Sequence, residues 1–348
     1  MIMEKFKIII DAMGGDNAPK EIIEGALLAF AERDDFDVIF TGKEEVLMPL
    51  LQDKGFEDRY EIVHTSQEIE MAESPVNAIK RKKDSSMVVG LNLLKEKKGD
   101  AFLTAGSTGA CIAGGTLIVR RIKGVERAAL CPFIPNVKGR SLLIDCGANV
   151  DCRPEQLRQF GQMGSIYMQT ICGMENPRVA LINNGAEEEK GCALTKEAYA
   201  LLKETDINFI GNIEGRDIML GGADVLVCDG FVGNVLMKFL EGTGKALITM
   251  LKKELMSSTR TKLGAALAKP AFQRFAKSMD YREYGGSLLL GVNGVVVKSH
   301  GSSDRKAIKN SIFQSIGYCE SGVLEKISEE LSKIKKSEEK NEADNSGQ

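Results

Sequence analysis

Short apolar runs that alternate with amphipathic stretches are the feature that most constrains the fold of this chain. Runs such as Lys7–Ile10, Ala101–Thr104 and Val225–Asp229 lead into turns rich in Gly, Asp and Asn, and helical periodicity follows. Continuous apolar runs indicate strands buried on both faces, as in parallel sheets that are covered by helices. The pattern therefore predicts a three-layer α/β/α fold with a largely parallel sheet.

The alternation continues along the chain without an internal repeat or a linker of shifted composition. A chain of 348 residues can bury a large core without disulfide or metal support. We therefore expect one domain over residues 1–334. Residues 335–348 are charged and lack large apolar side chains, so we expect a disordered tail there. The other expected strands are Val38–Thr41, Ile62–His64, Leu142–Asp145, Val179–Ile182, Phe209–Gly211 and Val295–Ser299.

Composition excludes several classes of function. Lys and Arg number 46 and Asp and Glu 49, so the net charge is −3 and bulk charge gives no affinity for nucleic acid. The eight cysteines lie at least six positions apart and form no C-x-x-C motif. This excludes zinc ribbons and dithiol redox sites and is typical of a reducing cytoplasm. With only His64 and His300, we expect neither a histidine-based triad nor a metal site.

Two apolar segments resemble export or membrane signals only superficially. Ile8–Ile10 is too short for a signal peptide, so we expect none. Ala101–Val119 has 19 uncharged residues, but it includes four Gly and four Ser or Thr. That composition favours a strand, a loop and a helix over a membrane span.

Six polar loops follow expected strands. Ligands bind at the carboxyl ends of strands in open parallel sheets, and exposed N–H groups at helix N-termini attract anions. Each loop alone meets only the needs of a βα turn, but six at one sheet edge favour a site for a phosphate-bearing ligand. The loops are Asp11–Pro19, Thr104–Gly109, Asp145–Asp151, Asn183–Gly191, Asp229–Asn234 and His300–Asp304.

Standard nucleotide and hydrolase motifs are absent from the sequence. There is no G-x-G-x-x-G motif of dinucleotide-binding folds. Gly242–Lys245 resembles part of a Walker A motif, but Phe239 replaces its first Gly and Ala246 its Ser or Thr. Ala105 stands where the nucleophile elbow of hydrolases has its first Gly.

A site of this composition holds anions but offers few bases or nucleophiles. Inorganic phosphate is its own nucleophile, and an acyl thioester is a natural electrophile for it. The reaction needs a cation for the phosphate and a neutral donor for the developing oxyanion, roles that suit Lys190 and Asn234. The alternatives are a solvated lysine and an asparagine that caps the next helix. His300 either supports the structure or contacts the substrate.

The same loops resemble the bacterial phosphate acyltransferase family, the acyl-acyl-carrier-protein:phosphate acyltransferases. The resemblance runs in order from about Lys7 to Glu320. Each motif alone is weak, but six in sequence are highly specific. They are Asp11–Asp16, Thr104–Ala110, Asp145–Asn149, Gly185–Gly191, Asp229–Asn234 and His300–Asp304.

The resemblance implies transfer of a long-chain fatty acyl group from acyl carrier protein to inorganic phosphate. The acyl phosphate product would feed phosphatidic acid and phospholipid synthesis, with a glycerol-3-phosphate acyltransferase as downstream partner. It also implies a homodimer with a fold like those of phosphotransacetylases and isopropylmalate-type dehydrogenases. No metal, nicotinamide or other cofactor is expected. The implied location is the cytoplasm, with peripheral association to the inner face of the cell membrane.

The family motifs also imply site residues. Lys190 matches the Lys of the acidic-Lys-Gly motif and Asn234 the Gly-Asn after Asp-Gly-Phe, so both are expected to be catalytic. Ser107 stands where many members have Asn, and Ala186 where many have Thr, so no amide role is expected at the first position and no role at the second. The residues expected to bind substrate or phosphate are Gly14, Gly15, Asp16, Gly106, Ser107, Thr108, Gly109, Asn149, Asp229, His300, Ser302 and Ser303.

The segment Lys245–Arg282 is long, helical and basic. Its net charge is +7, while the rest of the chain carries about −10. Leucines recur at helical spacing up to Pro270, which is expected to end that stripe, and a second apolar stripe follows. We expect a protruding hairpin of two amphipathic helices, and we favour contact with an anionic membrane over a dimer-interface or core stripe. The expected membrane contacts are Leu255, Leu263, Leu267, Phe272 and Phe275.

Two shorter basic runs, Lys80–Lys83 and Arg120–Lys123, would steer an acidic carrier protein, although such runs are ordinarily solvated helix faces. Three other functions remain open at this point. They are a short-chain phosphotransacetylase that uses acetyl-coenzyme A, a non-catalytic lipid-surface scaffold, and a decarboxylating dehydrogenase, for which the sequence has no nicotinamide fingerprint.

Overall fold

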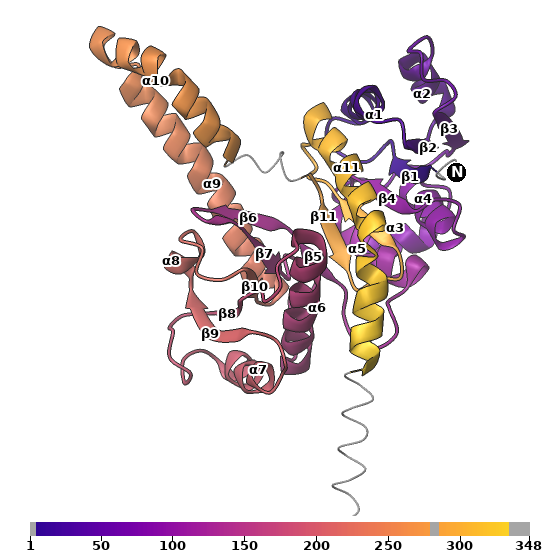
Figure 1. Cartoon of the computed structure of the whole chain (residues 1–348). Coiled ribbons are helices and arrows are strands. Elements are labelled where there is room, and N and C mark those ends of the chain that lie inside the picture. Colours follow the sequence, from indigo (N-terminus) through magenta and orange to yellow (C-terminus); the bar gives the residue numbers. More distant parts are fainter. Residues whose placement is uncertain (1–4, 279–284, 334–348) are drawn as a thin grey trace, which may run out of the picture.

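Two largely parallel β-sheets form the frame of the protein (Figure 1). The computed structural model describes residues 5–278 and 285–333. The larger sheet has the order β3-β2-β1-β4-β12-β11-β5 and the smaller the order β6-β7-β10-β8-β9. The strands are β1 Phe6–Asp11, β2 Phe36–Gly42, β3 Tyr60–His64, β4 Ala101–Thr104, β5 Ala129–Cys131, β6 Phe133–Asn136, β7 Gly139–Ile144, β8 Val179–Asn183, β9 Phe209–Glu214, β10 Val225–Val227, β11 Ser287–Leu290 and β12 Val295–Lys298.

Only β11 in the larger sheet and β6 in the smaller pair antiparallel with their neighbours. The predicted α/β/α class with mostly parallel strands is confirmed. The expectation that all six polar loops leave one sheet edge is corrected, because the strands that precede them are divided between two sheets. The sequence pattern shows that a strand is buried but carries no record of which strand it pairs with.

Helices cover both faces of the two sheets. Along each buried strand, alternate side chains enter different cores, since successive residues point to opposite faces. Ile8 and Ile10 join a core shared by both sheets, whereas Ile9 enters a second core behind the larger sheet. The helices are α1 Lys20–Glu32, α2 Glu44–Leu51, α3 Pro75–Arg81, α4 Ser86–Lys95, α5 Thr108–Gly114, the π-helical η1 Gly115–Val119, α6 Pro154–Cys172, α7 Ala193–Lys203, α8 Gly215–Ile218, α9 Gly230–Leu255, α10 Thr259–Ser278 and α11 Arg305–Ser321.

The chain passes from the larger sheet to the smaller at Pro132, between β5 and β6. The sheets are joined there by backbone hydrogen bonds, from the Leu143 N–H to the Pro132 carbonyl and from the Cys146 N–H to the Leu130 carbonyl, each 2.9 Å long. The shared core adds a second connection, in which the hydroxyls of Tyr167 and Tyr318 lie 2.8 Å apart. These contacts fix one sheet against the other, so loops from both can build one site.

Helices α9 and α10 form the predicted hairpin, which projects away from both sheets (Figure 1). The hairpin begins at Gly230, earlier than expected, and Pro270 lies inside α10 without ending it. The break falls at Met256–Ser258 instead, where the Ser258 hydroxyl accepts a hydrogen bond of 3.2 Å from the Thr261 N–H and caps the second helix. Pro270 has no N–H to donate and its ring crowds the carbonyl of the preceding turn, so it weakens α10 locally without ending it.

Among the described residues, none of the helices combines the length and apolarity needed to cross a bilayer. Ala101–Val119 folds as β4, a loop, α5 and η1, as the sequence predicts. Arg282, which closes the predicted hairpin segment, lies outside the described residues, and so does the expected tail at 335–348.

Candidate active site

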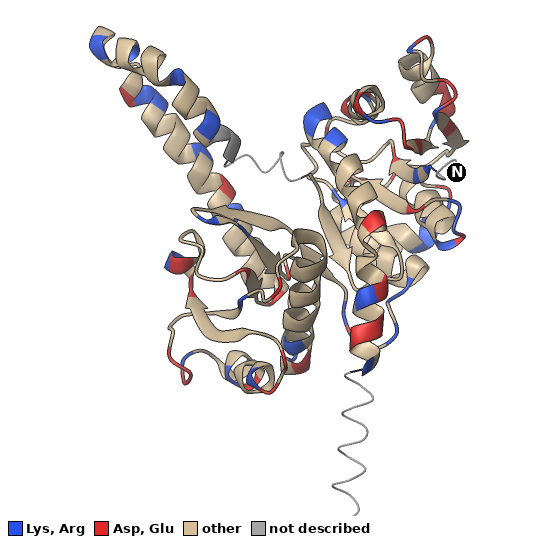
Figure 2. Cartoon of the chain, in the orientation of Figure 1, with Lys and Arg blue, Asp and Glu red and all other residues tan. Residues whose placement is uncertain are grey.

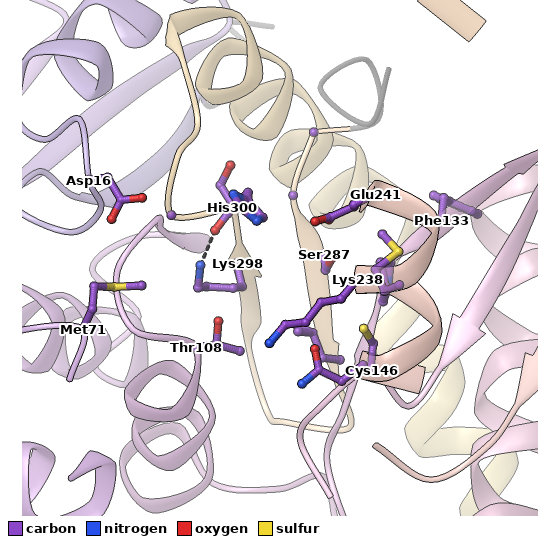
Figure 3. Close-up of a pocket in the computed structure, with 18 residues that line it drawn as sticks. Asp16, Met71, Thr108, Phe133, Cys146, Lys238, Glu241, Ser287, Lys298 and His300 are labelled. Carbon is purple, nitrogen blue, oxygen red and sulfur yellow. Dashed lines mark hydrogen bonds between the residues drawn. The ribbon is translucent and has the colours of Figure 1, made fainter. Parts of the chain in front are cut away.

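A cavity of about 290 Å³ lies where the two sheets meet, beside the start of α9. Figure 3 shows its lining: the end of β12 and the start of α5 on one side, and α9 on the other. The link between β5 and β6 adds Leu130, Pro132 and Phe133 to the wall. Because these elements belong to different sheets, the cavity exists only in the folded chain.

Lys298 supplies a buried cation to the cavity. It is the last residue of β12, and only 6% of its surface is exposed. Its ammonium donates hydrogen bonds to the carbonyl oxygens of Ala105, at 3.3 Å, and Ser299. Burial lowers the pKa of Lys298 to about 8, because the charged form loses hydration.

Most of the predicted phosphate loops are used to build the structure around the cavity. The fully buried Asp11 accepts a hydrogen bond of 2.7 Å from the Thr104 hydroxyl, which itself accepts one of 2.9 Å from the Gly106 N–H. Burial raises the pKa of Asp11 above its usual value. A Cβ at Gly14 would lie 2.4 Å from the Asp11 carboxylate, so Gly14 is required for close packing. Gly15 has a φ of +113°, which favours glycine.

Other predicted binding residues cap helices or join loops. The Ser107 hydroxyl accepts from the Ala110 N–H at 3.5 Å, and the Asp229 carboxylate caps α9 by accepting from the Val232 N–H at 2.8 Å. Ser303 is buried against the Ser299 hydroxyl at 2.8 Å. The Asn149 amide donates to the Ala128 carbonyl at 2.7 Å and to Asp145. Such side chains hold the loops in place rather than facing the cavity.

Four of the predicted site residues line the cavity: Asp16, Thr108, Asn234 and His300. Gly14, Gly15, Gly106, Ser107, Gly109, Asn149, Asp229, Ser302 and Ser303 lie outside its lining. His300 is exposed, and its Nδ1 lies 2.8 Å from the Ser302 hydroxyl.

Lys190 is exposed in the loop after β8 and is not part of this lining. Strand β8 pairs with β10, which leads directly into α9, so Lys190 and Asn234 follow neighbouring strands of the smaller sheet. The backbone carbonyl of Lys190 accepts a hydrogen bond of 3.1 Å from the Asn183 amide. Lys190 is thus carried by an anchored loop, outside the lining of the cavity.

Helix α9 presents one polar face to the cavity. Asn234, Lys238 and Glu241 share that face because they are spaced by about one helical turn. Lys238 extends from α9 into the cavity (Figure 3). The half-buried Asn234 packs over Gly147, where a Cβ would lie 3.6 Å from the amide carbon of Asn234. Asn234 is therefore held at the wall by the loop after β7.

Asp145 holds the loop after β7 in place through hydrogen bonds. Its carboxylate accepts hydrogen bonds from the backbone N–H groups of Leu130 at 2.8 Å, Asn149 at 2.6 Å and Ala148 at 3.3 Å. It thereby connects the strand β5 to the loop that supports Asn234. Burial raises the pKa of Asp145 from 3.8 to about 6, despite these donors.

This pKa shift predicts how stability depends on pH. A raised pKa means that the folded state binds the Asp145 proton more tightly than the unfolded state. Protonated Asp145 therefore contributes about 3 kcal/mol to the free energy of unfolding below about pH 4, and this contribution is lost as the pH rises through 6. Asp145→Asn does not titrate, so its stability should lack this pH-dependent part, and the difference in unfolding free energy between wild type and variant should shrink as the pH rises from 4 to 7.5. Urea unfolding of both proteins from pH 4 to 7.5 measures this; parallel curves would contradict it.

Neither Lys298 nor the apolar wall is predicted by the sequence motifs. The available signal for Lys298 was a single charged residue at the end of a run of three valines, separated by two residues from Gly301 and Ser302. Nothing in the sequence indicated that Leu130 and Phe133 would face the loops after β4 and β12. Within the described ranges, no group of three or more His, Cys, Asp or Glu side chains is arranged to hold a metal ion.

Comparisons with known proteins agree with this architecture. A phosphotransacetylase from Streptococcus pyogenes shares the fold with a TM-score of 0.60 and 19% identity, covering 91% of this chain and 94% of that one. A branched-chain phosphotransacylase from Enterococcus faecalis does so with a TM-score of 0.56 and 14% identity, covering 91% and 99%. At this level of identity, the likeness concerns the fold alone.

Closer relatives appear at the sequence level. The family described as fatty acid synthesis protein matches residues 6–326. A phosphate acyltransferase from Alkaliphilus oremlandii is 50% identical, covering 94% of this chain and 98% of that protein. A phosphate acyltransferase from Clostridioides difficile is 48% identical, covering 97% and 99%. The chain therefore belongs to the phosphate acyltransferase family of fatty acid synthesis proteins.

Proposed function

We propose that this protein transfers a long-chain fatty acyl group from acyl carrier protein to inorganic phosphate, giving acyl phosphate for phosphatidic acid and phospholipid synthesis. The observation that carries the proposal is the composition of the cavity. One wall holds the buried Lys298 with Thr108, and the opposite wall holds the amide of Asn234. Leu130, Pro132 and Phe133 add an apolar surface. Such a cavity suits an anion at one end and an acyl thioester at the other.

The reaction needs no separate base. The hydrogen phosphate dianion attacks the thioester carbonyl carbon, a C–O bond forms, and the carbonyl oxygen becomes an oxyanion that the Asn234 amide stabilises. Collapse of this intermediate breaks the C–S bond and releases the carrier thiolate. The proton that the phosphate carried then passes to the thiolate, so acyl phosphate and free thiol are formed. Lys190, on the neighbouring loop, is proposed to neutralise negative charge during the transfer.

The volume of the cavity limits how much of the two substrates it can enclose. At about 290 Å³ it lies at the lower end of ordinary ligand sites, which run from about 300 to 1,000 Å³. It suits phosphate and the thioester end, while a long acyl chain would extend beyond it. We propose that basic residues outside the cavity guide the acidic carrier protein. Arg120, Arg121 and Lys123 are exposed, whereas Lys82 is engaged by Glu73 at 2.5 Å and is less suited.

A thiol-release assay tests the function. Purified protein is given palmitoyl-acyl carrier protein, with and without phosphate, and the released thiol is measured. We expect release only with phosphate, together with acyl phosphate. Release from acetyl-coenzyme A but not from the carrier protein would indicate a short-chain phosphotransacetylase. Vesicle binding without any phosphate-dependent release would indicate a lipid-surface scaffold, and nicotinamide binding a dehydrogenase.

We further propose a cytoplasmic homodimer that associates peripherally with anionic membrane through the α9–α10 hairpin. Figure 2 shows Lys and Arg along both helices. The apolar side chains between them are unusually open: Leu263 is 70% exposed, Leu267 86% and Phe275 56%. Leu255 and Phe272 are half-buried and contribute less surface. Exposed apolar residues among basic ones suit the boundary of an anionic bilayer. The acyl phosphate could then pass directly to a glycerol-3-phosphate acyltransferase there.

This proposal makes a separate prediction. The double variant Leu263→Glu and Leu267→Glu should lose at least about tenfold in vesicle binding, because two apolar contacts become anionic. Its thiol release in solution should stay near the wild-type value, since α10 lies outside the cavity. Flotation with vesicles of anionic and of neutral lipid measures binding. Unchanged flotation combined with dissociation of a dimer in light scattering would assign this face to the dimer interface instead.

A further inference from the structure

Lys298 is a buried charge at the cavity that the proposed roles of Lys190 and Asn234 do not use. It ends β12 after three buried valines, so a strand of the larger sheet delivers its ammonium to the cavity wall. Figure 3 shows it beside Thr108 and His300. A lysine in such a place needs a physical explanation, because lysine is rarely buried without a charged partner.

The contacts of Lys298 leave part of its ammonium unsatisfied. The group has three donors, and two of them go to the carbonyl oxygens of Ala105 and Ser299. In the described ranges, none of the carboxylates forms an ion pair with it. The titratable groups around it are Asp11, Asp16 and Cys111 on its own side, His300 beside it, and Lys238 and Glu241 across the cavity on α9.

The hydrogen bonds of the Lys298 ammonium go to backbone carbonyl oxygens and to none of the neighbouring carboxylates in the described ranges, which leaves room for an anion there. Burial raises the pKa of Asp11, whose carboxylate accepts a hydrogen bond from the Thr104 hydroxyl, and it raises the pKa of Cys111 to about 12, so the Cys111 thiol stays neutral. Asp16 is exposed, where water screens its charge. Lys298 itself lacks hydration, and an anion at its remaining donor would offset that loss.

We propose that Lys298 binds the inorganic phosphate that accepts the acyl group, at the end of the cavity formed by Thr108 and the turn after β12. The inference rests on the proposed function and adds a substrate-binding residue to it. In its protonated form, Lys298 neutralises part of the dianion while one phosphate oxygen remains free to attack. The carbonyl carbon then lies toward Asn234 on the opposite wall, so the phosphate and the oxyanion donor act from two sides.

Lys298→Met tests the proposal, because methionine is unbranched and has no charge. We expect the apparent KM for phosphate to rise about 10- to 100-fold, the usual effect of losing a charge-assisted hydrogen bond to an anion. The KM for palmitoyl-acyl carrier protein should change less than about twofold. Lys298→Arg, which keeps the charge, should recover part of the loss. Lys7→Met, which removes an exposed lysine from the start of β1 at the opposite sheet edge, is the matched control and should leave both values unchanged.

Equilibrium dialysis with labelled inorganic phosphate separates this inference from the proposed function. If wild-type protein binds phosphate and Lys298→Met does not, the site is supported even if no thiol is released. If wild-type protein releases thiol and Lys298→Met binds phosphate as tightly as wild type, the proposal is wrong. The pH dependence needs no variant: the wild-type dissociation constant for phosphate should rise about tenfold between pH 7.5 and 9, as Lys298 loses its proton near pH 8. If Lys298→Met fails to fold, the wild-type measurement decides alone. A dissociation constant for phosphate that stays the same from pH 7.5 to 9 would then overturn the assignment.

Discussion

Replacing Asn234 with alanine is expected to lower the turnover number for phosphate-dependent thiol release by about 10²–10³, with the fold intact. Asn234 lies at the cavity wall and is half-buried, so its amide can donate to an oxyanion that forms in the cavity. Loss of one such donor costs about 3–4 kcal/mol of transition-state stabilisation. The KM for phosphate should change little, because the phosphate is held at the opposite wall.

The measurement is steady-state thiol release, with thermal unfolding as the check on the fold. Asn234→Asp is the matched variant: it keeps the shape but replaces a donor with a negative charge, so it should be at least as inactive as the alanine variant. Near-wild-type turnover in Asn234→Ala would defeat the oxyanion role and reduce Asn234 to a residue that packs over Gly147.

Gly233→Ala should give the largest loss of stability among single substitutions near the site. A Cβ at Gly233 would lie 1.9 Å from the backbone carbonyl oxygen of Asp145 and 3.1 Å from the sulfur of Cys228. Neither the helix α9 nor the strand end can move without disturbing the other, because a backbone atom receives the contact. We expect a loss of about 3 kcal/mol or more and a fall in Tm of about 4 °C or more.

The same helix provides the control for this prediction. Gly242 is also in α9, and a Cβ there would meet no atom within 4 Å. Gly242→Ala should therefore stabilise the protein by about 0.5–1 kcal/mol through helix propensity alone. Differential scanning calorimetry of both variants compares the two effects. Equal Tm values would mean that α9 is not packed on the Asp145 carbonyl as described.

Turnover should fall in the variant that disturbs the packing of α9 and should be unchanged in the variant that does not. Displacing the first turn of α9 moves Asn234, the residue directly after Gly233, away from the cavity. Gly233→Ala should therefore lose at least about tenfold in turnover even below its unfolding temperature, since a shift near 1 Å at a reacting group costs that much or more. Gly242→Ala should keep wild-type turnover.

The sequence alone predicted those elements whose formation depends on residues that are close together in the chain. Apolar runs predicted the buried strands, and polar Gly-rich turns predicted the loops at their ends, because burial and turn geometry depend on neighbouring residues. The motifs Thr104–Gly109 and Asp229–Asn234 therefore located Thr108 and Asn234, which line the cavity. The same reasoning could not separate them from Gly14 or Ser107, because capping and close packing use the same small polar residues as anion binding.

What the sequence alone determined was the α/β class, the strand ends and the chemical character of the loops. Only the tertiary structure decided which loops meet. Pairing between distant strands divided them between two sheets, and the crossing at Pro132 brought Leu130 and Phe133 into the same cavity lining as Lys298. The physical reason is that strand pairing and burial are properties of contacts between residues far apart in the chain. A lysine after three valines becomes a site residue only when packing removes its water and leaves one donor facing a cavity.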